Sequence, residues 1–323
     1  MDAAIATTVA GIVRSEIGQM ELDQVQSNRA QLIERVRESV ANVVDDWGIE
    51  VTRAEILDVN LDDATRAAML QQLNAERARR AQVTEAEGKR RAVELAADAV
   101  LAITSTLRPS MLEFMDAVAI NAVEDKLKMG LDRGAAAMMV AASDERGPAG
   151  ASDAEFMAQV FTDHGATEVF STSDPAEGEA FVAARRFAIP AVEAKGSLLL
   201  EDVGVPLPAL ADLVAGIEKI AAHRDLVISV IAHAGDGNTH PSVFFDNDDP
   251  ASVTAGYDAF HRIMGLGLEL GGTITGEHGV GALKAEWLAK ELDEGNRRLH
   301  RSIKDAVDPT GILNPGKLVP DRN

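Results

Sequence analysis

The sequence contains no cysteine in its 323 residues. This absence excludes disulfides, thiolate metal sites, cysteine nucleophiles and iron–sulfur clusters together. It is compatible with a protein that stays in a reducing compartment. We therefore expect a cytoplasmic location, with peripheral attachment to a membrane through partners as the alternative.

Positive charge is scarce as well. The chain carries 31 Lys and Arg against 52 Asp and Glu, which gives a formal net charge of −21. Binding to a phosphate backbone needs clustered Lys and Arg, so this balance argues against a nucleic-acid partner. It argues equally against adsorption to an anionic membrane surface. By itself, the negative charge indicates only good solubility.

Long apolar runs are also missing. No run approaches the ~18–20 residues that a bilayer-spanning helix needs, and the first residues lack the basic region of a signal peptide. We therefore expect a soluble chain without a transmembrane segment. Hydrophobic residues make up 46% and charged residues 26%, which is typical of a globular protein. The length allows two domains, at roughly 100–200 residues each.

The composition changes near residue 97, and we place a domain boundary there, giving residues 1–97 and 98–323. In the first part, residues 24–45 have the spacing of an amphipathic helix, and residues 49–59 begin as an alternating strand. From Leu61 to Ala97 the chain is rich in Ala, Glu, Arg and Gln, which are strong helix formers. Few of these positions are apolar, so we expect a long, exposed helix.

After residue 98, short apolar segments alternate with helical patterns. We expect strands at 111–115, 135–142, 167–172, 198–202, 226–233 and 241–246. We expect helices at about 116–128, 152–164, 175–194, 207–222 and 249–270. Strands that alternate with helices in this way predict an α+β sandwich or, as the alternative, βαβ units.

The first segment with chemical potential is His233 to His240, which follows the apolar strand. In one continuous strand, residues seven apart would point to opposite faces. The turn Gly235-Asp236-Gly237 breaks this alternation and can fold both imidazoles toward one point. The alternative is that the two histidines only cap strand ends.

The second segment, residues 271–281, has five glycines in eleven positions. Adjacent Glu277 and His278 normally diverge, so that one can face a metal while the other faces a substrate. Two histidines and a carboxylate are a usual ligand set for a catalytic divalent metal with an open position. Alternatively, a glycine-rich loop can cradle a phosphate. Neither segment has the G-x-G-x-x-G or Walker spacing, however.

These two motifs, together with the closing stretch 308–317 (DPTGILNPGK), resemble the C-terminal domain of FAD-linked oxidases. That group includes D-lactate dehydrogenase, the glycolate oxidase D subunit and D-2-hydroxyglutarate dehydrogenase. Further matches lie at Pro109, Glu113, Met115, Asp116 and 201–206, in the family's order from about 98 to 320. The resemblance implies an α+β fold with a ferredoxin-like antiparallel sheet and covering helices.

The resemblance also implies a reaction, the FAD-dependent oxidation of a small 2-hydroxyacid, of the D-lactate or glycolate type, to the 2-oxoacid. In it, a metal assists proton abstraction and hydride passes to flavin. The implied roles are metal ligation by His233, His240 and Glu277, with zinc or manganese as the metal, and base catalysis by His278. Arg185 and Asn238 would contact the substrate carboxylate or hydroxyl, and Arg186 is an equal candidate by sequence.

The N-terminal part resembles the second half of a stomatin-like (SPFH, band 7) domain, in the stretches 14–20, 46–53, 75–81 and 85–88. Such domains scaffold membrane assemblies, so the resemblance implies a homo-oligomer. This fragment stands where the resembled oxidases carry their FAD domain. We therefore expect no FAD-binding domain in this sequence, no flavin-binding residues that can be named, and an FAD-domain partner in trans.

Two other functions stay open at this point. One is a stomatin-like scaffold or oligomerisation protein that carries the oxidase domain as a passenger. The other is an inactive fusion remnant, since the join lies inside an expected helix. On either view, we expect no turnover by this chain alone, because hydride transfer needs a flavin acceptor.

Overall fold

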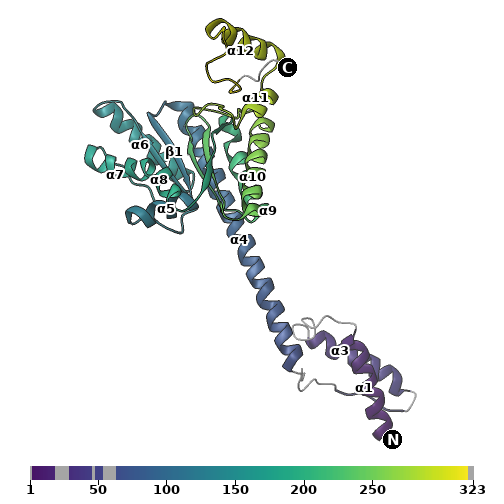
Figure 1. Ribbon diagram of the computed structural model, residues 1–323. Helices are drawn as coiled ribbons and strands as arrows, with labels where there is room; N and C mark the ends of the chain where they lie inside the picture. Colours follow the sequence, from purple (N-terminus) through teal and green to yellow (C-terminus); the bar gives the residue numbers. More distant parts are fainter. Residues whose placement is uncertain (1, 19–28, 46–47, 54–62, 319–323) are drawn as a thin grey trace. The chain divides into compact units, whose positions relative to one another are not determined.

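The computed structural model describes residues 2–18, 29–45, 48–53 and 63–318. The chain divides into two compact units, Met1–Arg80 and Ala81–Asn323. The division falls within helix α4 (Asp63–Thr106). The boundary expected near residue 97 stays a prediction. Figure 1 shows the elements of each unit.

The first unit is built on two helices, α1 (Asp2–Gly18) and α3 (Arg29–Val44). The buried face of α3 repeats every four residues and packs on apolar residues of α1. This face consists of Leu32, Val36, Val40 and Val44. The predicted amphipathic helix is confirmed over its described residues. Of the strand expected at 49–59, residues 49–53 form no strand, and 54–59 lie outside the described residues.

Helix α4 changes character along its length. Its described side chains between residues 83 and 91 are exposed, as expected for a solvated helix. Its last turns then bury Val93, Val100 and Ile103 in the core of the second unit. These residues are spaced at seven and three positions, so they lie on one face of the helix.

The second unit contains one six-stranded sheet in the order β2-β1-β5-β6-β3, with β4 also paired to β6. The strands pair antiparallel throughout the described sheet. The strands are β1 (Met111–Asp116), β2 (Ala137–Ala142), β3 (Leu198–Leu200), β4 (Val203–Gly204), β5 (Ile228–His233) and β6 (Asn238–Phe244). This confirms the predicted α+β class and the antiparallel sheet.

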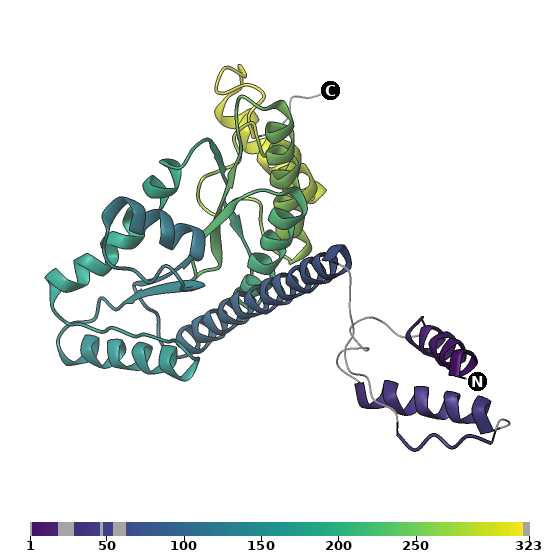
Figure 2. The same ribbon diagram turned by 90° about the horizontal axis from the view of Figure 1, so that it is seen from below.

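Helices cover both faces of this sheet (Figure 1 and Figure 2). Alternate residues of β5 face opposite ways: Val230 packs in one apolar cluster with α9 and α10, and Ile231 packs in the other with α5, α7 and α8. The helices are α5 (Ala117–Leu127), α6 (Pro148–Asp163), α7 (Pro175–Arg186), α8 (Ala188–Glu193), α9 (Leu210–Arg224), α10 (Pro250–Glu269), α11 (Ala285–Glu291) and α12 (Glu294–Val307).

Two expected elements differ from the structure. The described residues 167–172 form no strand, and Phe170 is exposed there, so no neighbouring strand or core fixes the segment. The helix expected at 175–194 is broken at Phe187 into α7 and α8. Pro190 explains the break, because proline has no N–H to bond the carbonyl four residues earlier and its ring clashes with that carbonyl. None of the described helices is both long and apolar enough to cross a bilayer.

Candidate metal and substrate site

A tight hairpin brings His233 and His240 together. His233 ends β5 and His240 lies in β6, where its register partner is Ile231, two residues before His233. Both imidazoles therefore lie on one face of the sheet, and their ring centroids are 5.2 Å apart. Gly237 in the turn has φ +81°, and a Cβ there would come within 2.1 Å of the Val205 carbonyl oxygen. The predicted effect of this glycine turn is confirmed.

Glu277 reaches the same point from the loop between α10 and α11. Its Oε1 lies 2.9 Å from Nε2 of His240 and 3.3 Å from Nε2 of His233. The ligand atoms of all three side chains lie within 4.8 Å of one another. For comparison, ligand atoms about 2.1 Å from a tetrahedral zinc are about 3.4 Å apart. The three side chains thus fit around one cation.

The partners of the Nδ1 atoms determine which ring nitrogens face Glu277. Nδ1 of His240 lies 3.3 Å from the Glu201 carbonyl oxygen, and Nδ1 of His233 lies 2.8 Å from Oε1 of Glu113. Both partners accept hydrogen bonds, so the proton is assigned to each Nδ1, and a ring that is neutral then directs its Nε2 lone pair toward Glu277. Two lone pairs and a carboxylate at this distance repel one another unless a cation or proton lies between them. The donor set therefore fits a divalent metal.

The surroundings of the two imidazoles differ. Burial lowers the pKa of His240, whose side chain is only 1% exposed, and this keeps the ring neutral, as metal ligation requires. The hydrogen bond to Glu113 raises the pKa of His233, whose side chain is 34% exposed. Glu277 is half exposed. The site is therefore closed on the side of His240 and open to solvent on the side of Glu277.

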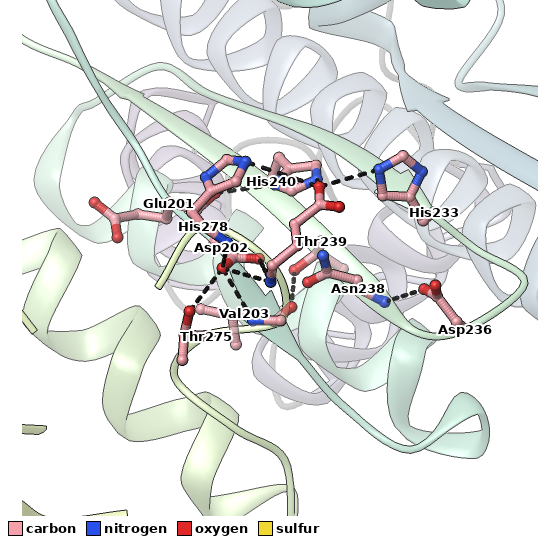
Figure 3. Close-up of polar contacts among 12 residues, drawn as sticks. Glu201, Asp202, Val203, His233, Asp236, Asn238, Thr239, His240, Thr275 and His278 are labelled. Atoms are coloured by element: carbon pink, nitrogen blue, oxygen red, sulfur yellow. Dashed lines mark hydrogen bonds and ion pairs between the residues drawn. The ribbon is translucent and has the colours of Figure 1, made fainter. Parts of the chain in front are cut away.

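His278 lies next to these three side chains but outside their set. Its ring stacks on that of His240, with centroids 4.7 Å apart and 13° between the planes. Its Nε2 is 3.8 Å from Oε1 of Glu277, and 39% of its side chain is exposed. Figure 3 shows the rings of His278, His240 and His233 in a row. The imidazole is placed to accept a proton from a molecule bound beside Glu277.

The carboxylate of Asp202 holds the glycine-rich loop in shape. Its Oδ2 accepts the backbone N–H groups of Gly276, Glu277 and His278 at 2.8–3.0 Å, and the hydroxyl of Thr275 at 2.9 Å. Burial alone would raise the pKa of Asp202, but these hydrogen bonds hold it below its ordinary value. A glycine-rich loop can bind a phosphate through its backbone N–H groups, but here those of residues 276–278 donate to the Asp202 carboxylate.

Asp202 also belongs to a second group of candidate ligands, with His240 and His278. Its carboxylate already accepts the backbone N–H groups of the loop, and this set would use His278, the predicted base, as a ligand. The set of His233, His240 and Glu277 needs neither change. We therefore take that set as the candidate metal site.

Lys284 stabilises the glycine-rich loop through two hydrogen bonds. Its buried Nζ donates to the carbonyl oxygens of Asp202 and Ile274, both at 2.9 Å, and lies 3.8 Å from Oε2 of Glu201. Burial raises the pKa of Glu201 to about 7 and lowers the pKa of Lys284. Among the described residues, neither carboxylate oxygen of Glu201 has a hydrogen-bond partner. Figure 3 shows this side chain pointing away from the imidazoles.

The two predicted substrate contacts are both buried. Arg185 is 9% exposed, and its Nε donates to Oε2 of Glu113 at 2.7 Å. The alternative candidate, Arg186, forms an exposed ion pair with Glu179. Asn238 is 8% exposed, and its side chain helps to hold the pKa of Asp202 below its ordinary value. The substrate roles of Arg185 and Asn238 stay predictions.

A cavity of about 490 Å³ opens beside His233. Its charged lining residues are Arg108, Glu113 and Asp236. The remaining lining comes from the end of α4 and the start of β1, namely Thr104, Leu107, Pro109, Ser110, Met111 and Leu112, and from Gly235. This cavity gives a small polar molecule access to His233.

No role in the site was predicted for Glu113, Asp202 or Lys284. Glu113 and Asp202 stood in stretches that resembled the oxidase family, and Lys284 lay just beyond the glycine-rich segment. The hydrogen-bond partners of the two acids lie 72 to 120 positions away in the sequence. Both acids lie in expected strands, and an acidic residue that a strand buries needs a partner. This pattern was the signal that could have identified them.

Two family models match the chain in sequence. The family described as "FAD linked oxidases, C-terminal domain" matches residues 89–318. The family described as "SPFH domain / Band 7 family" matches residues 1–90. The two matches agree with both resemblances seen in the sequence.

Curated relatives resemble the C-terminal part. The glycolate oxidase subunit GlcD of Bacillus subtilis (strain 168) is 36% identical over 217 residues, which are 67% of this chain and 46% of the relative. The same subunit of Escherichia coli (strain K12) is 33% identical over 68% of this chain and 44% of the relative. The mitochondrial D-lactate dehydrogenase [cytochrome] of Arabidopsis thaliana is 31% identical over 71% of this chain and 41% of the relative. The chain thus spans about half the length of these relatives.

Among solved structures, p-cresol methylhydroxylase with bound substrate is similar in fold. The TM-score is 0.51 and the sequence identity 15%, over 70% of this chain and 51% of that one. At this identity the likeness concerns the fold alone.

Proposed function

The chain belongs to the family of FAD-linked oxidase C-terminal domains, and from this membership we propose that it is the metal- and substrate-binding part of a 2-hydroxyacid oxidoreductase. The substrate is a small 2-hydroxyacid of the D-lactate or glycolate type, and the product is the 2-oxoacid. The observation that carries this proposal is the convergence of His233, His240 and Glu277 on one point beside His278.

His233, His240 and Glu277 would hold a zinc or manganese ion. Two neutral imidazoles and one carboxylate suit both metals, and the exposed side of Glu277 leaves room for a further ligand. When bound, such a cation supplies Lewis-acid polarisation of the substrate hydroxyl and lowers its pKa. The buried Nδ1 partners of both imidazoles support this assignment, since they orient the rings before any metal arrives.

The chain's own residues would handle the proton and the carboxylate. His278 accepts the hydroxyl proton at its exposed ring, which the stack on His240 holds in one orientation. Arg185 uses Nε on Glu113, so its terminal nitrogens are the ones that would meet a substrate carboxylate. Asn238 would act through its Oδ1, which has no partner among the described residues.

The flavin would come from a separate FAD domain acting in trans. Flavin supplies the acceptor for the hydride that leaves the 2-carbon. The glycine-rich loop does not fit its pyrophosphate, because the N–H groups of residues 276–278 already bind Asp202. We therefore assign no flavin-binding residue in this chain.

A reconstitution assay tests this proposal. The full chain, loaded with zinc or manganese, is mixed with FAD and the separately produced part of the B. subtilis relative that this chain does not cover. Oxidation of D-lactate or glycolate is followed with a dye acceptor. Turnover should require both proteins and should be lost in Glu277→Gln. His223→Ala, which changes an exposed histidine of α9, is the control. Turnover that persists in Glu277→Gln, or a chain that binds neither metal, would contradict the proposal.

The match of residues 1–90 to the SPFH family supports an additional scaffold role. In this role the N-terminal unit assembles copies of the chain into a homo-oligomer. Light scattering of the full chain and of a chain lacking residues 1–97 tests it. A full chain that is monomeric would contradict it.

A further inference from the structure

The carboxylate of Glu113 lies between His233 and Arg185. Oε1 is 2.8 Å from Nδ1 of His233, and Oε2 accepts the Nε hydrogen of Arg185 at 2.7 Å. The β1–β5 register makes Glu113 and His233 direct neighbours, and both lie on the sheet face that α7 covers. Glu113 and Arg185 are 8% and 9% exposed. Nδ1 of His233 and Nε of Arg185 thus each have their own acceptor oxygen on the Glu113 carboxylate.

We propose that Glu113 is a positioning residue that keeps the proton of His233 on Nδ1, and that Arg185 fixes the orientation of the side chain at position 113. This inference rests on the proposed metal site and deepens it. A ring that is protonated on Nδ1 presents the lone pair of Nε2 toward Glu277, 3.3 Å away. A ring protonated on Nε2 would present a hydrogen to the metal instead.

The two imidazoles differ in how they are supported. Nδ1 of His240 faces a backbone carbonyl, which is present whatever residue stands at position 201. Nδ1 of His233 faces a side chain, so its support depends on the identity of residue 113. Glu113 forms a buried ion pair with Arg185, with 2.7 Å between Oε2 and Nε. An ionised carboxylate accepts at both oxygens and donates at neither.

Because Arg185 only donates hydrogen bonds, a glutamine at position 113 cannot make both hydrogen bonds that Glu113 makes. An amide has one acceptor and one donor end, whereas the guanidinium only donates. In Glu113→Gln the amide oxygen must therefore face Arg185, which leaves the NH₂ group against Nδ1 of His233. That contact favours the proton on Nε2, the nitrogen that a metal needs. Without the guanidinium, the amide is free to turn and accept from Nδ1 again.

Removing Arg185 should therefore change metal affinity differently in the natural chain and in the Glu113→Gln variant. In the natural chain, Arg185→Met takes away the cation beside a buried carboxylate and brings no gain in metal binding. In the Glu113→Gln chain, the same change restores part of the lost affinity. A purely structural role for Glu113 and Arg185 predicts that the double variant is worse than either single variant.

The experiment uses the full chain and its three variants, Glu113→Gln, Arg185→Met and the double variant. Zinc affinity is measured by competition with a chromophoric chelator, and folding by circular dichroism. The His233 tautomer is read from ¹⁵N chemical shifts and couplings of the metal-free protein at alkaline pH. The matched controls are Glu179→Gln, Arg186→Met and their combination, which alter the exposed ion pair next to Arg185 on α7.

The proposal expects Nδ1–H at His233 in the natural chain and Nε2–H in Glu113→Gln. Zinc affinity should fall roughly 10- to 100-fold in Glu113→Gln and rise again in the double variant, while the controls bind as the natural chain does. Unchanged affinity in Glu113→Gln, or a double variant no better than this single one, would overturn the proposal.

The tautomer measurement separates this inference from the metal site itself. If the natural chain binds no zinc, the proposed function fails, but the proton position on His233 still decides the role of Glu113. If Glu113→Gln does not fold, the natural chain alone still provides the test, because Nε2–H at His233 there would overturn the proposal.

Discussion

Oδ2 of Asp202 accepts the backbone N–H of His278 at 2.8 Å. The same oxygen accepts the N–H groups of Gly276 and Glu277, so one buried carboxylate fixes three consecutive peptide groups. Asp202 thus holds the backbone from which Glu277 and His278 both extend toward His240. The loop resembles a phosphate-binding turn in its hydrogen bonding, but its anion belongs to the chain.

Asp202→Asn should weaken this loop and change the acid stability of the protein. The folded-state pKa of Asp202 lies below its ordinary value of 3.8, so its contribution is present above that pH and is lost as the pH falls through the folded-state pKa. Hydrogen bonds to a charged group contribute about 1.5–3 kcal/mol each. Urea denaturation at neutral pH should show the variant less stable, with the difference shrinking in acid. A difference that is constant with pH would argue against this role.

Glu201→Gln should have the opposite pH dependence. Burial raises the pKa of Glu201 from 4.5 to about 7, so the folded state retains a proton that the unfolded state releases between these values. Stability therefore falls as the pH rises from 4.5 to 7, by up to about 3 kcal/mol at 1.36 kcal/mol per pKa unit. The glutamine variant lacks this loss. Its stability relative to the natural chain, measured by urea denaturation, should increase over that range and then level off. A flat difference would contradict this explanation.

Gly276→Ala should distort the glycine-rich loop by a steric clash with Asn238. A Cβ at position 276 would come within 2.3 Å of Oδ1 of Asn238, and the buried asparagine has little room to move. We expect a loss of roughly 1–3 kcal/mol in unfolding free energy, as for other overpacked interiors, together with weaker zinc binding. Gly178→Ala is the matched control, because an added Cβ in α7 meets nothing within 4 Å. Equal behaviour of the two variants in urea denaturation and zinc titration would refute this steric argument.

The sequence predicted most of the fold because its apolar residues follow local periods. β1, β5 and α10 begin and end within two residues of the expected positions, and each has a buried face with the right repeat. The segment 167–172 failed because β propensity alone provides no strand partner. The broken helix after α7 depended on Pro190, which the helical pattern around it concealed.

The candidate site could be predicted only in part. Two features of the site are local in sequence, namely the turn at Gly237 and the adjacent pair Glu277 and His278. The sequence could therefore suggest Glu277 as a metal ligand and His278 as a base. The supports are non-local. Glu113 meets His233 through strand register, and Asp202 meets the loop across the sheet edge, and neither pairing leaves a local periodic signal. Arg185 was predicted to meet substrate, whereas its contact with Glu113 could only be seen in three dimensions.

We propose that one metal ion binds Nε2 of His233, Nε2 of His240 and Oε1 of Glu277. Anomalous diffraction at the zinc absorption edge, from crystals of the full chain grown with zinc, tests it directly. We expect one strong peak about 2.1 Å from each of these three atoms. A peak at Asp202 and His278 instead, or no peak near His240, would contradict it.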